Sequence, residues 1–115
     1  MRVDVNRRGS PRADVGAGRI RASFLGSSYD VRNISASGLL ILPYDGASTI
    51  GQFLRLMIAI DDCGLNFAFE ADARVVRIER DSVAMQFHAI SSEGRERLAA
   101  YFSRRFSSNL FDVKA

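Results

Sequence analysis

Two short segments contain the residue types that could bind a nucleotide. The first, RGSPR at residues 8–12, places Arg8 and Arg12 four positions apart. If this segment is extended, their Cα atoms lie roughly 13 Å apart at ~3.3 Å per residue, a spacing that can straddle a compact dianion. A guanidinium group also pairs through two parallel N–H donors with a phosphate or a guanine edge, and it can stack on a base. The segment therefore indicates an anion- or nucleotide-binding site.

The second segment, NISASG at residues 33–38, comes at the end of an expected strand. Asn33 and Ser35 lie on one face of an extended chain because side chains alternate with a period of two. An amide and a hydroxyl suit the edge of a base, since Asn carries both a donor and an acceptor. Gly38 permits a positive φ or the close approach of a ligand. The alternative is an ordinary turn, for which Asn, Ser and Gly are the usual residues.

Positive charge is concentrated near the N-terminus. The net charge of the chain is +3, and the first 21 residues hold six arginines against two aspartates, so the rest of the chain is slightly acidic. Fifteen of the sixteen basic residues are arginine. Because the early segment also contains Pro and Gly, residues 1–17, which we call the arm, can hardly form a regular helix or a central strand, and their arginines could bind an anion. The alternative is a solvated basic tail.

After the arm, the chain alternates apolar and polar residues, and this alternation predicts six strands within residues 18–90. Their sequences are RIRASFL, YDVRNIS, GLLILP, QFLRLMIAI, LNFAFEADARVVRIE and VAMQFHAI. The phase of alternation changes at VVR, so we expect a bulge or bend there. Short turns with no intervening helix favour a mainly β fold, an antiparallel barrel or sandwich. We expect a six-stranded antiparallel β-barrel, because closure leaves no exposed sheet edge.

The C-terminal part predicts one α-helix. Ser91 or Ser92 is a suitable N-cap, and apolar residues recur at helical spacing at Leu98, Phe102 and Phe106. We expect a helix over 91–107 and a tail over 108–115. The chain is then a single domain over 1–115, made of the arm, the barrel and this helix.

Several function classes are disfavoured. No apolar run approaches the ~20 residues of a membrane span, and the N-terminus is charged, so we expect a cytoplasmic protein without a membrane span in this chain. Cys63 is the single cysteine and His88 the single histidine, which excludes an internal disulfide and the usual zinc sites. We find no catalytic residues, no metal ligands and no catalytic cofactor site, and we expect a protein that is not an enzyme.

In order and spacing, the two segments resemble the motif pair RxxxR and [DN]xSxxG of the PilZ domain family, bacterial receptors for cyclic di-GMP. The resemblance continues over most of the chain, in NISASGLLIL, GQFLRLMI, ADARVVRI, VAMQF and SSEGRERLAAYF. RxxxR alone occurs by chance in arginine-rich chains. The ordered pair in an expected six-stranded domain is specific.

The resemblance implies that residues 1–17 are a flexible ligand-binding arm, and it implies a binding role for six residues. Arg8 and Arg12 would grip phosphates and a guanine, Asn33 and Ser35 would bind the other guanine, and Gly38 would leave room for it. Arg7 stands immediately before RxxxR, where an arginine resembles receptors that bind two intercalated ligand molecules. The expected ligand is therefore cyclic di-GMP, bound as an intercalated dimer.

The resemblance further implies a change of conformation on binding, signalled to an unidentified effector protein or a fused output domain that controls motility, biofilm formation or exopolysaccharide synthesis. One alternative is an adaptor with the PilZ fold that does not bind the nucleotide, although the intact motif residues argue against it. Another is a basic barrel for single-stranded nucleic acid, which needs exposed aromatic residues. We expect no DNA or RNA partner, because the aromatic residues of the expected strands fall on inward faces.

Overall fold

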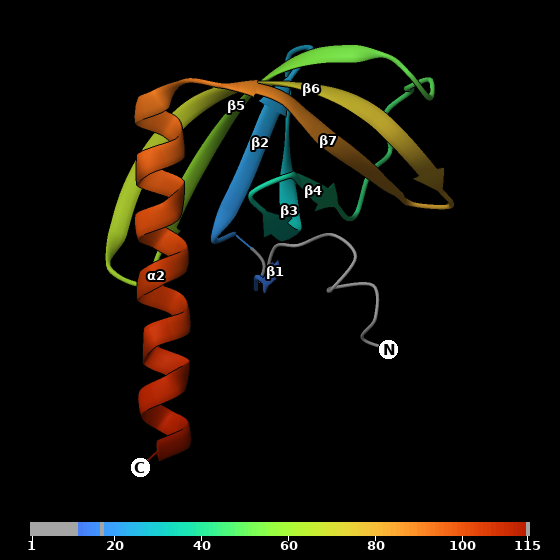
Figure 1. Cartoon of the computed structure of the whole chain (residues 1–115). Helices are drawn as coiled ribbons and strands as arrows, with labels where there is room; N and C mark the ends of the chain where they lie inside the picture. Colours follow the sequence, from blue (N-terminus) through green and yellow to red (C-terminus); the bar gives the residue numbers. More distant parts are fainter. Residues whose placement is uncertain (1–11, 17, 115) are drawn as a thin grey trace.

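The computed structural model describes residues 12–16 and 18–114, with side chains for 13–16 and 18–106. This part of the chain forms seven strands followed by a helix, drawn in Figure 1. The elements are β1 (Arg12–Asp14), β2 (Ile20–Phe24), β3 (Ser27–Ser35), β4 (Gly38–Ile41), β5 (Phe53–Asp62), β6 (Leu65–Glu79), β7 (Ser82–Ile90) and α2 (Ser92–Lys114).

Six of these strands close into an antiparallel barrel. The strands are hydrogen-bonded in the order β3, β2, β5, β6, β7, β4, and β4 pairs in turn with β3. This confirms the predicted six-stranded barrel. The short strand β1 pairs in addition with the end of β3, in register from Arg12 opposite Ser35 to Asp14 opposite Asn33. Residues 12–14, expected within the arm, are therefore part of the sheet.

The period of two places the core inside the barrel. Strands β2 and β5 alternate strictly between buried and exposed residues, as their sequences predict. In β5 the buried residues are Leu54, Leu56, Ile58 and Ile60. Phe53, at the start of the same strand, lies outside, with 62% of its surface exposed and its ring edge-on to His88 at 5.5 Å between centroids. The expectation that all strand aromatics face inward is wrong at this position, because Phe53 takes the outward phase of the alternation.

Strand β6 is interrupted where the sequence predicts an irregularity. In its pairing with β7, Val75 lies opposite Met85, yet Arg77 lies opposite Ala84. Two steps along β6 thus correspond to one step along β7, which defines a β-bulge at Val76. Val75 is buried, whereas Val76 and Arg77 are both exposed. The bulge reverses the phase of the strand.

Helix α2 begins at a cap. The hydroxyl of Ser91 accepts a hydrogen bond from the amide of Gly94 at 3.0 Å, so Ser91 is the N-cap. Leu98 and Tyr101 are fully buried against the barrel, and Phe102 is partly buried. The helix runs to Lys114 and so includes most of the tail expected over 108–115, because no Gly or Pro follows to end it. Its C-terminal end extends beyond the strands (Figure 1).

Candidate functional site

The pairing of β1 with β3 joins the two segments that the sequence analysis singled out. Arg12, the second arginine of RxxxR, lies opposite Ser35 of NISASG in the register of these strands. The side chain of Arg12 and the whole of Arg7 and Arg8 lie outside the described residues. What the structure places is therefore the backbone of Arg12 beside Ser35.

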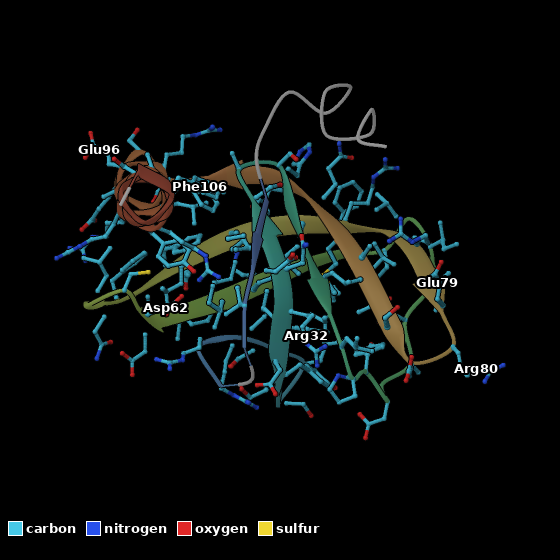
Figure 2. The ribbon with its side chains drawn as sticks, turned by 90° about the horizontal axis from the view of Figure 1, so that it is seen from below. Arg32, Asp62, Glu79, Arg80, Glu96 and Phe106 are labelled. Atoms are coloured by element: carbon cyan, nitrogen blue, oxygen red, sulfur yellow. The ribbon has the colours of Figure 1, made fainter. Side chains whose placement is uncertain are left out.

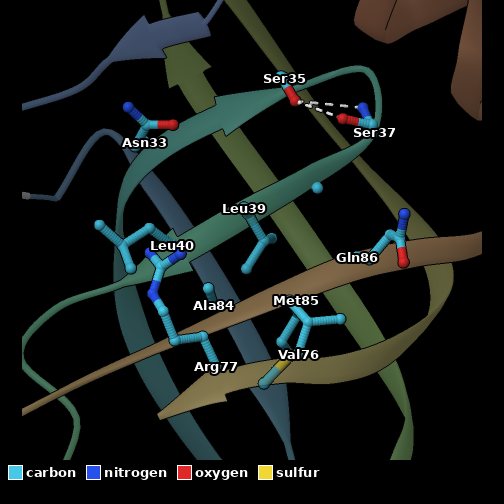
Figure 3. A pocket seen from close by; sticks show the side chains of 11 residues that line it. Asn33, Ser35, Ser37, Leu39, Leu40, Val76, Arg77, Ala84, Met85 and Gln86 are labelled. Carbon is cyan, nitrogen blue, oxygen red and sulfur yellow. Dashed lines mark hydrogen bonds between the residues drawn. The ribbon is translucent and has the colours of Figure 1, made fainter. Parts of the chain in front are cut away.

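A hollow of about 380 Å³ lies over β3, β4, β7 and the end of β6 (Figure 3). Its volume falls in the range of small-molecule sites. The residues that line it are Asn33, Ser35, Ser37, Gly38, Leu39, Leu40, Val76, Arg77, Ala84, Met85 and Gln86. Three of the expected ligand-binding residues, Asn33, Ser35 and Gly38, thus lie together in one concave site.

Asn33 already has a partner in this site. Its amide nitrogen donates to the carboxylate of Asp14, with 2.6 Å between Nδ2 and Oδ1. The two residues are directly opposite each other in the β1–β3 pair, and paired residues share a face of the sheet. The same pairing that brings Arg12 to the site therefore also brings a negative charge.

Ser35 is nearly buried and organises the turn between β3 and β4. Its hydroxyl accepts a hydrogen bond from the backbone amide of Ser37 at 3.2 Å and lies 3.1 Å from the hydroxyl of Ser37. This side chain–backbone turn fixes the two serine hydroxyls at the rim of the hollow. Ser37 was not singled out from the sequence, and the Ser-x-Ser spacing was the signal available for it.

Position 38 must be glycine because strand β7 passes close to its backbone. A Cβ at this position would clash with the carbonyl oxygen of Met85 and lie 3.2 Å from the Cα of Gln86. Its φ is not among the positive values, which occur at other glycines. Of the two reasons that the sequence offered for this glycine, a positive φ does not apply. Gly38 does allow a close approach, but by the backbone of β7 and not by a ligand. That backbone occupies the space that a side chain at position 38 would need.

Arg77 and Gln86 form the wall of the hollow farthest from β1, on β6 and β7. Neither residue was predicted. The bulge at Val76 was visible in the sequence, but which residues it would bring to the site depends on the register of β6 and β7. The nearest carboxylate to Arg77 is that of Glu79, with 3.5 Å between Nε and Oε2 and both side chains more than half exposed.

A polar cluster connects β1 to helix α2. Arg105 donates to the carbonyl oxygen of Asp14, and its Nη1 lies 2.6 Å from Oδ2 of Asp62. The hydroxyl of Tyr101 donates to the same carboxylate oxygen at 2.8 Å. Burial, and after it the hydrogen bond to Asp62, raises the pKa of Tyr101 to about 12. The cluster holds the strand that carries Arg12 against the helix.

The part of the chain that the structure describes holds neither a metal-binding cluster nor a membrane-spanning helix. Over residues 12–16 and 18–114, no three His, Cys, Asp or Glu side chains gather closely enough to hold a metal ion. Within the same ranges, no helix is both long and apolar enough to cross a membrane.

The fold recurs in solved structures. An uncharacterized Legionella protein is 20% identical with a TM-score of 0.63, over 86% of this chain and 97% of that one. The Bacillus subtilis inhibitor of motility, MotI/DgrA, is 26% identical with a TM-score of 0.74, over 89% of this chain. The chain corresponds to about half of that protein, 52% of its length. No curated protein matches the sequence. The PilZ domain matches residues 2–104, nearly the whole chain, and the protein therefore belongs to the PilZ domain family.

Proposed function

We propose that the protein is a non-enzymatic receptor for cyclic di-GMP whose ligand binds in the hollow that the second motif lines, beside the strand that carries Arg12. The observation that carries the proposal is the β1–β3 register, in which Arg12 of the first motif lies opposite Ser35 of the second. Membership of the PilZ family supports the choice of ligand. The ligand-binding residues we propose are Arg7, Arg8, Arg12, Asn33, Ser35 and Gly38.

The chemistry of the site matches the ligand. Cyclic di-GMP carries two phosphates and two guanines, so it needs cationic donors and polar groups that read a base edge. Arginine side chains from RxxxR supply donors for phosphate oxygens and for O6 and N7 of guanine. The amide of Asn33 and the hydroxyl of Ser35 offer a further donor and acceptor at the rim. Gly38 contributes by letting β4 approach β7 closely, which keeps the floor of the hollow in place.

The output of the receptor is a contact with another protein or with a fused domain. Ordering of the arm around the ligand would change the surface next to β1 at some cost in affinity. The similarity to an inhibitor of motility makes control of motility the first process to examine. We place the receptor in the cytoplasm, where this second messenger is found.

Isothermal titration of the protein with cyclic di-GMP tests the proposal, with GTP and cyclic di-AMP as competing nucleotides. We expect selective binding that Arg8→Ala and Arg12→Ala each abolish while the circular dichroism spectrum is retained. Arg95→Ala is the matched control, because it removes the same charge from an exposed position of α2. Its affinity should equal that of the wild type.

Absence of binding by the folded wild-type protein would refute the receptor proposal. It would favour the adaptor hypothesis, which predicts a stable complex with a protein partner in the absence of nucleotide.

A further inference from the structure

One row of directly paired residues crosses the hollow from the second motif to β6. Asn33 is paired with Leu40, Leu40 with Ala84, and Ala84 with Arg77. Residues paired in this way share a face of the sheet, so Asn33 and Arg77 lie on the same face, three strand steps apart. At ~4.8 Å per step, the path between their backbones is about 14 Å.

The adjacent row of paired residues shows whether the row with Asn33 and Arg77 points into the barrel or out of it. It runs along the same strands through Ile34, Leu39, Met85 and Val75, and all four are buried. These residues point into the barrel. The row that holds Asn33 and Arg77 must therefore point outward, toward the hollow.

The bulge at Val76 is what puts Arg77 in the outward row. In an uninterrupted strand, Arg77 would share the inward face of Val75, because the two are separated by two positions. The extra residue reverses the phase, so that Arg77 lies opposite Ala84 and is exposed. Bulges are frequent beside binding sites, where they redirect a side chain.

The guanidinium of Arg77 is available for a ligand. Its contact with Glu79 is 3.5 Å long, whereas Arg55 reaches Asp72 at 2.8 Å and Arg21 reaches Asp30 at 2.6 Å. An ion pair between side chains that are 51% and 63% exposed contributes little. A ligand group can replace it at small cost.

Apolar side chains form the floor beside Arg77. Leu40, Ala84 and Val76 lie next to it in the hollow (Figure 3). An apolar floor suits the face of a purine base, whereas a phosphate would lose its hydration there. A planar fork of N–H donors at the edge of that floor suits O6 and N7 of guanine.

We propose that Arg77 binds the edge of a guanine of the ligand that lies on Leu40, Ala84 and Val76. It thus acts as a specificity-determining residue on the wall opposite the two motifs. This assignment rests on the proposed function and names a contact made by neither RxxxR nor NxSxxG. Gln86 also lines the hollow, on β7 directly opposite Gly38.

Titration of the Arg77→Ala and Arg77→Lys variants with cyclic di-GMP tests the assignment. We expect each to bind about tenfold to one hundredfold more weakly than wild type, since Lys keeps the charge but lacks the planar fork. Selectivity over cyclic di-AMP should fall by a similar factor. Arg80→Ala is the control, because Arg80 is exposed in the next turn and outside the hollow (Figure 2), and it should bind as wild type.

The outcomes separate the two proposals. If wild type binds and Arg77→Ala binds equally well, the role of Arg77 is overturned and the receptor proposal stands. If Arg77→Lys alone keeps full affinity, charge is sufficient and the guanine contact is wrong. If folded wild type does not bind, both proposals fall. Thermal unfolding should be unchanged in all three variants, since the substituted side chains are exposed.

Discussion

Asn33 donates a hydrogen bond to Asp14, 2.6 Å away, across the junction of the two motif segments. This pairing occupies a donor of the residue expected to read a guanine. It also places a carboxylate beside the position that we propose for an anionic ligand. If the proposal holds, Asp14 competes with that ligand, both for the amide of Asn33 and through its charge.

Removal of that carboxylate should strengthen binding. We expect Asp14→Ala to lower the Kd for cyclic di-GMP by about threefold to tenfold, the effect of roughly 1 kcal/mol at a solvent-exposed position. The gain should shrink at high salt. Titration at two ionic strengths measures both effects. Glu96→Ala, which removes the same charge from the exposed face of α2 (Figure 2), should leave Kd unchanged. Weaker binding by Asp14→Ala would mean that Asp14 orients Asn33 for the ligand.

Gly38→Ala should destabilise the barrel before any ligand is added. The new methyl group meets the carbonyl oxygen of Met85, so β4 and β7 must separate. We expect the free energy of unfolding in urea to fall by roughly 1–3 kcal/mol, as for other overpacked sites. Gly16→Ala is the matched control, since nothing lies within 4 Å of a Cβ there and its φ is not positive. Equal stability of the two variants would contradict the proposed strand contact.

The raised pKa of Tyr101 predicts that the folded protein loses stability at alkaline pH. Its pKa is raised from 10.0 to about 12 in the folded state, so between these values the folded protein keeps a proton that the unfolded chain has released. The free energy of unfolding is therefore unaffected below pH 10 and falls by up to about 2 kcal/mol as the pH rises toward 12. Urea unfolding at pH 8, 10 and 11.5 measures this. Tyr101→Phe should show a shallower decline, and an identical decline would assign the effect to other groups.

The presence of Arg7 before RxxxR leads to a prediction of how many ligand molecules bind. We expect the wild-type protein to bind two molecules of cyclic di-GMP and Arg7→Leu to bind one, because an arginine immediately before RxxxR resembles the receptors that bind an intercalated dimer. Titration calorimetry at protein concentrations well above Kd gives the stoichiometry directly. A value of two for both proteins would refute the role of Arg7, and a value of one for both would refute the intercalated dimer.

Local sequence patterns predicted the barrel because its strands are long and strictly alternating. Strand β5 and the bulge of β6 are examples in which the period of two, or its interruption, is visible in the residues themselves. Strand β1 was missed because three residues cannot show a period. The end of α2 was misplaced because no terminating residue marks it.

The motif residues of the site could likewise be found from sequence, whereas their surroundings could not. Asn33, Ser35 and Gly38 stand in one short segment with a recognisable spacing. Arg77 reaches the same hollow only through the registers of three successive strand pairs, which no local pattern specifies. The need for glycine at position 38 similarly depends on where β7 crosses β4.

The hydrogen bond from Arg105 to the carbonyl oxygen of Asp14 links strand β1 directly to helix α2. Asp14 is two residues from Arg12, and Arg105 is anchored to Asp62 on the barrel. Any displacement of β1 must therefore carry the guanidinium with it or break this bond. If binding of the proposed ligand moves β1, thermodynamic reciprocity requires that a protein bound to the helix change the affinity for that ligand by the same coupling free energy.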